Sequence, residues 1–307
     1  MWKIPVSESA AGSRLDVFLA KAVAGASRAA VQRWIVAGRV QVDGLVRKSA
    51  YRVSEGETVE VDPLPPEPMA VEPHELPLDI VYQDDDFVVL NKPAGVVVHP
   101  GAGIRRGTLV NALVYRYGSH LPAQEPLRPG IVHRLDKGTS GVMVVALKEF
   151  SHRELVKQFQ TRQVAKRYLA LVYGRVDPPE GVIDLPLGRD RRHRTRISPR
   201  TDRPRNAVTA YRVLRFYDGF SFLEVRPVTG RTHQIRVHFW ARGFPVVGDN
   251  VYVRRDRVRP LPGGFQLDRL FLHAESLEFH HPRTGRRLVF TVPLPDELVE
   301  ILNRLGK

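Results

Sequence analysis

A proline-rich stretch divides this chain of 307 residues into a short part and a long part. Residues 63–77 contain six prolines: Pro63, Pro65, Pro66, Pro68, Pro73 and Pro77. Because proline fixes φ and has no N–H to donate, such a stretch is extended and packs poorly as a helix or a central strand. We expect a linker at 63–77 between a small domain at 1–62 and a large domain at 78–307, which suits the length of the chain.

The composition is that of a chain that folds around an apolar core. Hydrophobic residues make up 43% of the sequence, which is enough for such a core. No apolar run reaches the roughly 18 residues of a membrane-spanning helix, and residues 1–6 lack the apolar centre of a signal peptide. Cysteine does not occur in the sequence, so disulfides and thiolate metal sites are excluded. We expect a cytoplasmic protein without a membrane segment.

The net charge of +14 is unevenly distributed, which favours a polyanionic partner. Residues 1–62 carry a net charge of +2, residues 63–77 carry −3, and residues 78–307 carry +15. Eight arginines lie between positions 189 and 205, and a second cluster consists of Arg254, Arg255, Arg257 and Arg259. Such clusters suit RNA phosphates, although a role in solubility alone stays open. We expect the first cluster to be a mobile loop that grips RNA, with these contact residues: Arg191, Arg192, Arg194 and Arg196.

The first 62 residues have the pattern of a small α+β module. Apolar residues at 15, 18, 19, 22 and 23 share one helical face, and Ser27 is a candidate N-cap for a second helix that ends near Gly38. Short strands are expected at 40–42 and 58–61. This order resembles, over about residues 13–61, the RNA-binding module first known from ribosomal protein S-four of the small subunit. The resemblance implies phosphate contacts by Arg28, Arg33 and Arg39; a generic small α+β domain is the alternative.

Residues 78–307 combine many strand-like runs with a few helical patterns. We expect strands at 80–82, 87–90, 96–98, 142–147, 168–172, 208–216 and 220–225. Helices are expected near 107–117, 150–162, 231–241 and 296–305. Because neighbouring strands are joined by short turns, the sheet should be antiparallel or mixed, and we predict the α+β class rather than a doubly wound α/β fold.

The nine residues 133–141 place one carboxylate, Asp136, at the edge of a predicted core strand. They read His-Arg-Leu-Asp-Lys-Gly-Thr-Ser-Gly, and the apolar run 142–147 follows directly. A rigid strand can aim a side chain at its end, so Asp136 is a candidate for catalysis. An aspartate that caps the loop, or that pairs with Arg134 or Lys137, is the simpler interpretation of an isolated Arg-Leu-Asp.

The stretch 133–141 resembles the active-site signature of the RluA/RluD family of pseudouridine synthases, which act on large-subunit ribosomal RNA. Further segments resemble the same family in the same order: 91–100, 166–172, 229–238, and 248–252 with 272–274. Together they span about residues 80–275. The resemblance implies the pseudouridine synthase fold, a mixed and mainly antiparallel sheet with flanking helices. It also implies an enzyme that isomerises uridine in RNA and needs no cofactor and no metal.

The resemblance assigns roles to five residues. Asp136 is the essential carboxylate, which either attacks the sugar or the base or removes the proton from the 2′ carbon of the ribose. Tyr168 packs on the flipped uracil, and Arg236 pairs with Asp136 and keeps it ionised. Arg134 enters the base stack where the target leaves, and Leu272 forms an apolar wall beneath the base.

For four of these residues another interpretation stays open. Tyr168 can be a core residue of its strand, and by composition Leu272 is simply a core residue. Arg236 can be a phosphate contact, and Arg134 can be half of a local salt bridge. A metal centre is not expected, because the spacing of His233 and His238 does not fit a one-turn helical pair.

A nucleophilic triad of His133, Asp136 and Ser140 is not expected either, because the three are too close in sequence to converge easily and no Gly-x-Ser-x-Gly elbow occurs. We therefore predict a monomeric RNA pseudouridine synthase whose substrate is large-subunit ribosomal RNA, free or within an assembling large subunit. The alternatives are the same reaction on tRNA and a non-catalytic RNA-binding factor of ribosome assembly.

Overall fold

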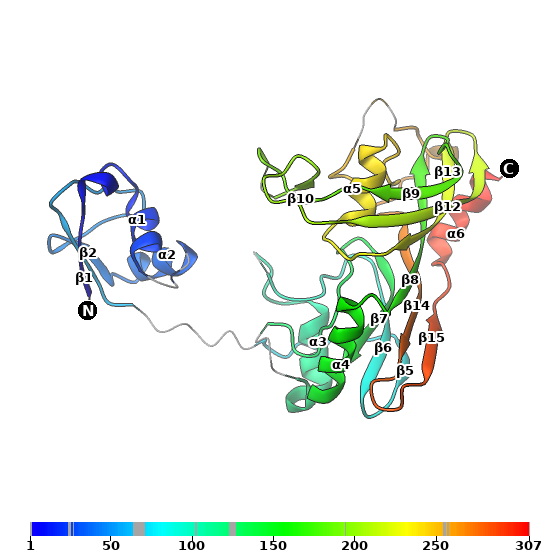
Figure 1. Cartoon of the computed structure of the whole chain (residues 1–307), viewed down its shortest axis with the longest axis horizontal. Helices are drawn as coiled ribbons and strands as arrows, with labels where there is room; N and C mark the ends of the chain where they lie inside the picture. Colours follow the sequence, from blue (N-terminus) through cyan, green and yellow to red (C-terminus); the bar gives the residue numbers. More distant parts are fainter. Residues whose placement is uncertain are drawn as a thin grey trace. The chain divides into compact units, whose positions relative to one another are not determined.

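The computed structural model describes residues 2–23, 26, 28–63, 71–101, 103–122, 127–193, 195–253, 256 and 258–306. The chain divides into two compact units, residues 1–69 and 70–307 (Figure 1). The boundary between the units falls inside the predicted linker 63–77. Three of that linker's six prolines and the predicted N-cap Ser27 lie outside the described residues, so the linker and its limits remain predictions. In the described part of the chain, no helix has the length and hydropathy needed to cross a membrane.

The N-terminal unit packs two helices on a small antiparallel sheet. The helices are α1 (Leu15–Ala22) and α2 (Arg28–Val36). The sheet has the order β1 (Trp2–Pro5), β4 (Thr58–Val61), β2 (Val40–Val42) and β3 (Leu45–Val46). Its core is apolar, because Leu15 and Leu19 of α1 and Val31 of α2 are fully buried with Val40 and Val59 of the sheet.

The C-terminal unit is built on one nine-stranded mixed sheet. Along the sheet the strands are β5 (Ile80–Gln83), β6 (Phe87–Lys92), β7 (Ser140–Ala146), β14 (Leu272–His280), β8 (Ala165–Tyr173), β13 (Phe220–Pro227), β12 (Val208–Tyr217) and β9 (Glu180–Asp184), and β15 (Arg287–Thr291) pairs with β14. Strands β7 and β14 run parallel, and the other pairs of this sheet are antiparallel. The predicted α+β class with a mixed, mainly antiparallel sheet is confirmed.

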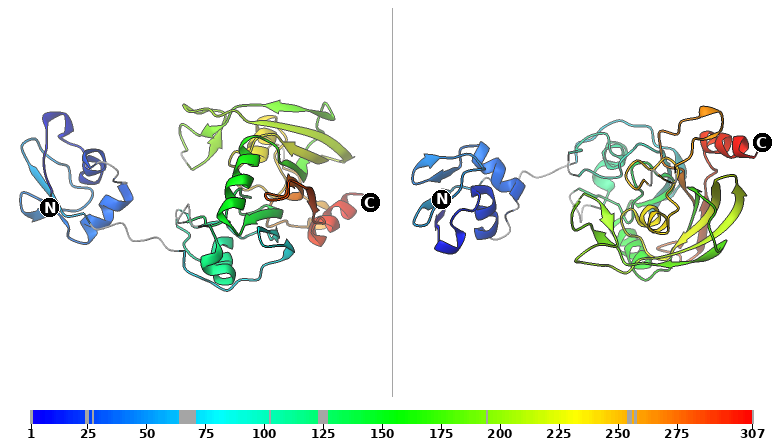
Figure 2. Two further views of the ribbon diagram at one scale, coloured as in Figure 1. Left: turned by 60° about the horizontal axis from the view of Figure 1, so that its bottom comes forward. Right: turned by 90° about the horizontal axis from the view of Figure 1, so that it is seen from above.

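Helices cover both faces of the sheet in each half of the unit. The helices are α3 (Leu109–Tyr117), α4 (Glu149–Gln160), α5 (Gln234–Ala241) and α6 (Asp296–Leu305). Helix α3 packs on the face of β7 that carries Met143, and α4 packs on the opposite face, which carries Val144. Likewise α5 packs on the face of β8 that carries Ala170, and α6 packs on the face that carries Leu171. Figure 2 shows α5, in yellow, against the yellow-green strands β12 and β13.

Three local predictions differ from the structure. The predicted strand 96–98 is irregular, and the carbonyls of Val97 and Val98 instead accept hydrogen bonds from the first N–H groups of α3. The helix predicted from 231 begins at Gln234. The basic segment predicted as a mobile loop contains a two-stranded hairpin, β10 (Gly188–Arg189) and β11 (Ile197–Ser198). Asp190 shapes its turn by accepting the N–H groups of residues 192 and 193.

Candidate active site

A cavity of about 490 Å³ opens in the C-terminal unit where the loop before β7 meets β8, β14 and the start of α5. That volume is in the range of small-ligand sites. Its lining brings together the five residues that the family resemblance singled out: Arg134, Asp136, Tyr168, Arg236 and Leu272. These residues come from separate parts of the sequence, so the fold assembles a site that no single motif contains.

The loop that carries Asp136 is fixed to its surroundings by backbone contacts. The N–H of Thr139 donates to the Asp136 carbonyl (3.1 Å), and the N–H of Gly95 donates to the Lys137 carbonyl (2.7 Å). Gly141 then pairs with Ala274 of β14 at a φ of +122°. A Cβ at position 141 would lie 2.2 Å from the Ala274 carbonyl oxygen, so only glycine permits this approach. The carboxylate is thereby held at the start of a core strand.

Arg236 is held between two carboxylates. Its Nε and Nη2 donate to Asp249 (2.7 and 3.0 Å), and its Nη1 donates to Oδ2 of Asp136 (3.1 Å). The Arg236 side chain is 7% exposed and the Asp136 side chain 15% exposed, so both are shielded from water while Asp136 keeps one open side. Burial works against the charge of Arg236, but its hydrogen bonds to Asp249, together with the charges of Asp249 and Asp136, raise its pKa above the ordinary value.

Asp249 was not assigned a role from the sequence, although the segment 248–252 was matched. It accepts the N–H groups of Val251 and Tyr252 (both 2.9 Å) in addition to Arg236. Burial opposes its ionisation, yet Arg236 and these N–H donors lower the pKa of Asp249 below its ordinary value. The sequence signal is an aspartate between Gly248 and Asn250 in the matched segment, which does not identify a partner.

The start of α5 is set by side-chain hydrogen bonds. Oε1 of Gln234 accepts from the Arg231 N–H (3.0 Å) and from the Thr229 hydroxyl (2.7 Å). His233, the residue before the helix, has a left-handed backbone (φ +55°). Its Nδ1 lies 2.8 Å from the Tyr252 hydroxyl, which also accepts the Ile197 N–H of the basic hairpin (2.9 Å). These contacts aim the first turn of α5, and with it Arg236, at the cavity.

Tyr168 and Leu272 form the apolar part of the lining. Tyr168 on β8 is paired with Ala274 of β14, the residue that also pairs with Gly141. Leu272 is 3% exposed and belongs with Tyr168 to one hydrophobic cluster. Burial, and then the charge of Asp136, raises the pKa of Tyr168 well above its ordinary value, so its hydroxyl stays protonated at neutral pH.

His133 and Ser140 of the signature have partners other than Asp136. Nε2 of His133 accepts the Val144 N–H (3.1 Å), and its ring stacks on Phe159 at 4.6 Å. Burial, and then the charge of Lys166, lowers the pKa of His133 to about 3, so the ring is neutral. The Ser140 hydroxyl lies 2.8 Å from Nδ1 of His273. A triad of His133, Asp136 and Ser140 is therefore not assembled.

The first of the matched segments, 91–100, contributes a buried lysine. The Lys92 side chain is fully buried, and its Nζ donates to the carbonyls of Pro93 (2.7 Å) and Val96 (2.9 Å). Burial, together with the charge of Arg269, lowers the pKa of Lys92 to about 7, while the charge of Asp136 opposes the shift. The segment thus shapes the loop that packs behind Asp136.

The arginines predicted to contact RNA are dispersed over the surface. Arg134 is exposed at the cavity. Arg191, Arg192 and Arg196 are exposed on the segment of the basic hairpin and do not line the cavity, and Arg194 lies outside the described residues.

In the N-terminal unit, Arg28 forms an ion pair with Asp16 (2.8 Å), and Arg39 forms one with Asp62 (2.6 Å). Arg33 is exposed. Both ion-paired side chains stay about half exposed, with 54% for Arg28 and 49% for Arg39, so each can still reach a phosphate. The predicted phosphate contacts of all three remain predictions.

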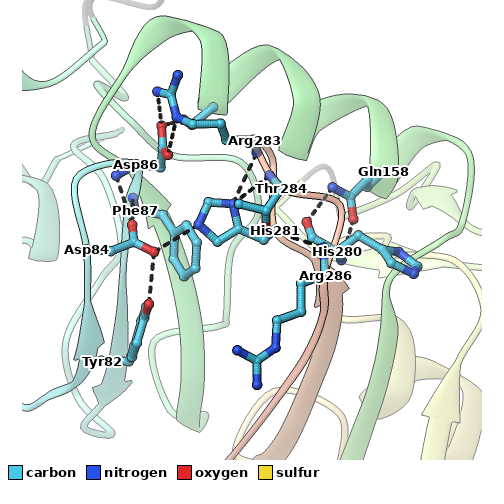
Figure 3. Close-up of polar contacts among 11 residues, drawn as sticks. Tyr82, Asp84, Asp86, Phe87, Gln158, His280, His281, Arg283, Thr284 and Arg286 are labelled. Atoms are coloured by element: carbon cyan, nitrogen blue, oxygen red, sulfur yellow. Dashed lines mark hydrogen bonds and ion pairs between the residues drawn. The ribbon is translucent and has the colours of Figure 1, made fainter.

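One group of described residues has the composition of a metal site: Asp84, Asp86 and His281 (Figure 3). Its ligand atoms are used within the protein. Both oxygens of Asp86 accept from Arg283 (2.7 and 2.8 Å), and Oδ2 of Asp84 lies 3.2 Å from Nε2 of His281. Nδ1 of His281 accepts backbone N–H groups of its own turn. A guanidinium inside the group repels a cation, so we interpret it as a clamp between the β5–β6 and β14–β15 turns.

Comparison with known proteins defines the class to which this fold and cavity belong. Residues 86–241 match the RNA pseudouridylate synthase family, and residues 13–59 match the S4 domain. The first match covers the loop of Asp136, β8 with Tyr168 and α5 with Arg236. The chain belongs to the RNA pseudouridine synthase family.

Individual relatives extend along almost the whole chain. An uncharacterized RNA pseudouridine synthase of Chloroflexus aurantiacus is 47% identical, with 98% of this chain and 92% of the relative covered. Ribosomal large subunit pseudouridine synthase D of Vibrio cholerae is 40% identical, with 96% and 92% covered. Among solved structures, human RNA pseudouridylate synthase domain containing 4 superimposes with a TM-score of 0.58 at 30% identity, over 74% of this chain and 93% of that chain.

Proposed function

We propose that this protein converts uridine to pseudouridine in large-subunit ribosomal RNA, with Asp136 as the essential carboxylate. The observation that carries the proposal is the contact between Asp136 and Arg236 inside a cavity that Tyr168 also lines. In the described lining Asp136 is the only carboxylate. One carboxylate beside a pocket for a planar base is what an isomerisation within a single nucleotide requires.

Four further residues of the lining have proposed roles in holding the extruded base or the carboxylate. Tyr168 offers a ring face that offsets the stacking lost when the uracil leaves the helix, and Leu272 offers an apolar wall. Arg134 is exposed beside the loop of Asp136 and can fill the gap in the stack. Arg236 holds the carboxylate in place through its hydrogen bond, so that Asp136 can attack the sugar or the base or remove the 2′ proton of the ribose.

The large ribosomal subunit is favoured as the source of the substrate by the names of relatives. Proteins of Vibrio cholerae and Xanthomonas campestris that are 40% identical to this chain are named ribosomal large subunit pseudouridine synthase D. The match of residues 13–59 to the S4 domain supports RNA as the partner. This substrate implies the cytoplasm as the compartment. We expect a monomer that acts on free rRNA or on an assembling large subunit.

Pseudouridine mapping tests the proposal. Large-subunit rRNA transcribed in vitro is incubated with the protein, and pseudouridines are mapped at single-nucleotide resolution beside an untreated sample. We expect new pseudouridine at defined positions of this RNA and none in tRNA treated in parallel. Modification of tRNA alone would show that tRNA, and not rRNA, is the substrate. Modification of neither RNA would favour a non-catalytic RNA-binding role.

A further inference from the structure

Two cationic side chains line the Asp136 cavity where α4 is followed by β8. Arg162 lies between the two elements, and Lys166 lies at the start of β8. Asp136 is the only carboxylate in the described lining, and it is engaged by Arg236. Arg236 in turn is neutralised by Asp249 as well. The charges of Arg162 and Lys166 are therefore in excess over the carboxylates of this cavity.

Arg162 occupies a backbone position that normally selects glycine. Helix α4 ends at Gln160, and Arg162 follows with a φ of +61°. The N–H of Gln163 donates to the Gln158 carbonyl (2.9 Å). This is the hydrogen bond that ends a helix when the residue after its C-cap has a left-handed backbone. A side chain in this conformation costs about 1 kcal/mol relative to glycine. An arginine stands at this position although glycine would avoid the strain, which points to a use for the arginine side chain in the cavity.

A cation near the C-terminus of a helix is stabilised by the helix dipole, but this does not account for Arg162. The benefit is about 0.3–1 kcal/mol for an exposed side chain, which at most offsets the backbone cost. Lys157, in the last turn of α4, already provides such a cation from a regular helical position. The helix end therefore needs a left-handed residue at position 162, but it does not need the arginine side chain.

Lys166 is a largely buried ammonium that borders open space. Its Nζ donates to the Thr229 carbonyl at 3.4 Å. Burial lowers the pKa of Lys166 to about 8, and no carboxylate of the described residues counters that shift, in contrast to Arg236. A Cβ built on Gly230 would lie 4.0 Å from this Nζ and would meet no other atom within 4 Å. The ammonium thus faces a space in which an anionic group would restore the electrostatic stabilisation that it lost on burial.

We propose that Arg162 and Lys166 form a phosphate-binding subsite that holds a backbone phosphate of the RNA strand beside the target uridine. A nucleotide that is flipped into the cavity brings its own phosphates to the cavity wall. A guanidinium binds phosphate through a fork of N–H groups, and an ammonium binds it as a point charge. This subsite rests on the proposed function, because it assumes that the strand around the uridine enters the cavity.

Arg162→Gly separates this role from a structural one. Glycine accepts the left-handed backbone, so the melting temperature should stay equal to that of the wild type or rise slightly. The affinity for an RNA hairpin with a uridine in its loop should fall about tenfold, and the slope of log K against log salt should decrease by about one. Lys166→Met should have the same effect on the slope. With large-subunit rRNA, both variants should raise KM more than they lower kcat.

Arg242→Gln is the matched control, because Arg242 is an exposed arginine at the end of α5 that does not line the cavity. It should leave affinity and salt slope unchanged. The proposal is overturned if Arg162→Gly and Lys166→Met bind the hairpin like the wild type, or if Arg242→Gln weakens binding equally. Absence of pseudouridine with the wild type, together with weaker binding of both variants, would reject the proposed reaction and leave the subsite in place.

Discussion

Asp249 binds Arg236 through two hydrogen bonds of 2.7 and 3.0 Å and leaves Nη1 of the guanidinium to Asp136. The guanidinium is planar, so fixing its Nε edge fixes the direction of Nη1. Asp249 is in turn fixed by the backbone N–H groups of Val251 and Tyr252. The position of Asp136, the proposed catalytic carboxylate, therefore depends on an acidic residue 113 positions away that does not line the cavity.

Asp249→Asn should damage both stability and activity. The variant leaves the charge of Arg236 half-compensated in a buried position, which costs about 3–5 kcal/mol when one partner of a buried pair is removed. Asp136 should lose its fixed orientation, so the rate of pseudouridine formation should fall at saturating RNA. Urea unfolding and single-turnover kinetics measure the two effects. Asp218→Asn, a change at a fully exposed acid in the β12–β13 turn, is the control and should alter neither; an Asp249→Asn variant of wild-type stability would contradict the prediction.

Asp136→Asn should abolish isomerisation and leave RNA binding close to that of the wild type. The amide keeps the shape of the side chain and can still contact Arg236, but it can act neither as a nucleophile nor as a base. Loss of a negative charge from a basic cavity does not weaken the attraction of phosphates. Pseudouridine mapping and equilibrium binding at one salt concentration check both parts. Any turnover above the background would show that another group performs the chemistry.

Gly141→Ala should destabilise the C-terminal unit by more than a simple backbone effect. The new Cβ would collide with the Ala274 carbonyl, so β7 and β14 would have to separate beside the loop of Asp136. Gly285→Ala is the matched control, because Gly285 also has a positive φ but a Cβ added there would meet no atom within 4 Å. We expect about 1 kcal/mol for the control and at least about 3 kcal/mol for Gly141→Ala in urea unfolding. Equal losses would show that β7 and β14 can adjust.

The sequence predicts the fold class through its local patterns, and it predicts the residues that line the cavity through its resemblance to a known family. Strand periodicity and short turns indicate a mixed sheet, and the motifs around Asp136, Tyr168 and Arg236 identify residues that the fold then brings together. The start of α5 could not be predicted in this way. Gln234 binds Thr229 and Arg231 with its side chain, and this turn replaces the first helical turn that the apolar pattern had suggested.

Contacts between segments that are distant in the sequence could not be predicted from its pattern either. The stretch 96–98 has the composition of a strand, but its carbonyls are needed to accept the N–H groups of α3. Asp249 is one of 33 acidic residues, and nothing near it in sequence selects Arg236 as its partner. The left-handed backbone of Arg162 is likewise set by the way α4 ends, since the residue type itself disfavours that conformation.

The clamp around Asp86 makes the stability of the C-terminal unit depend on pH (Figure 3). Hydrogen bonds from Arg283 lower the pKa of Asp86 below its ordinary value, burial opposes this, and the Ser151 hydroxyl (2.7 Å) adds to it. Because the pKa of the folded state lies below that of the unfolded state, this carboxylate contributes stability that is fully present above the unfolded pKa of about 3.9. The contribution is lost as the pH falls through the folded pKa.

Asp86→Asn should therefore cost more stability at neutral than at acidic pH. At pH 7 we expect a loss of about 1–3 kcal/mol in the free energy of unfolding, since Arg283 and Ser151 lose a charged acceptor in a buried position. Below about pH 4 the difference between wild type and variant should shrink, because the wild-type carboxyl is itself becoming protonated. Urea unfolding at pH 7, 5 and 3.5 measures the difference, with Asp85→Asn at the exposed neighbouring position as the control. A loss that is the same at all three pH values would mean that the charge of Asp86 does not stabilise the clamp.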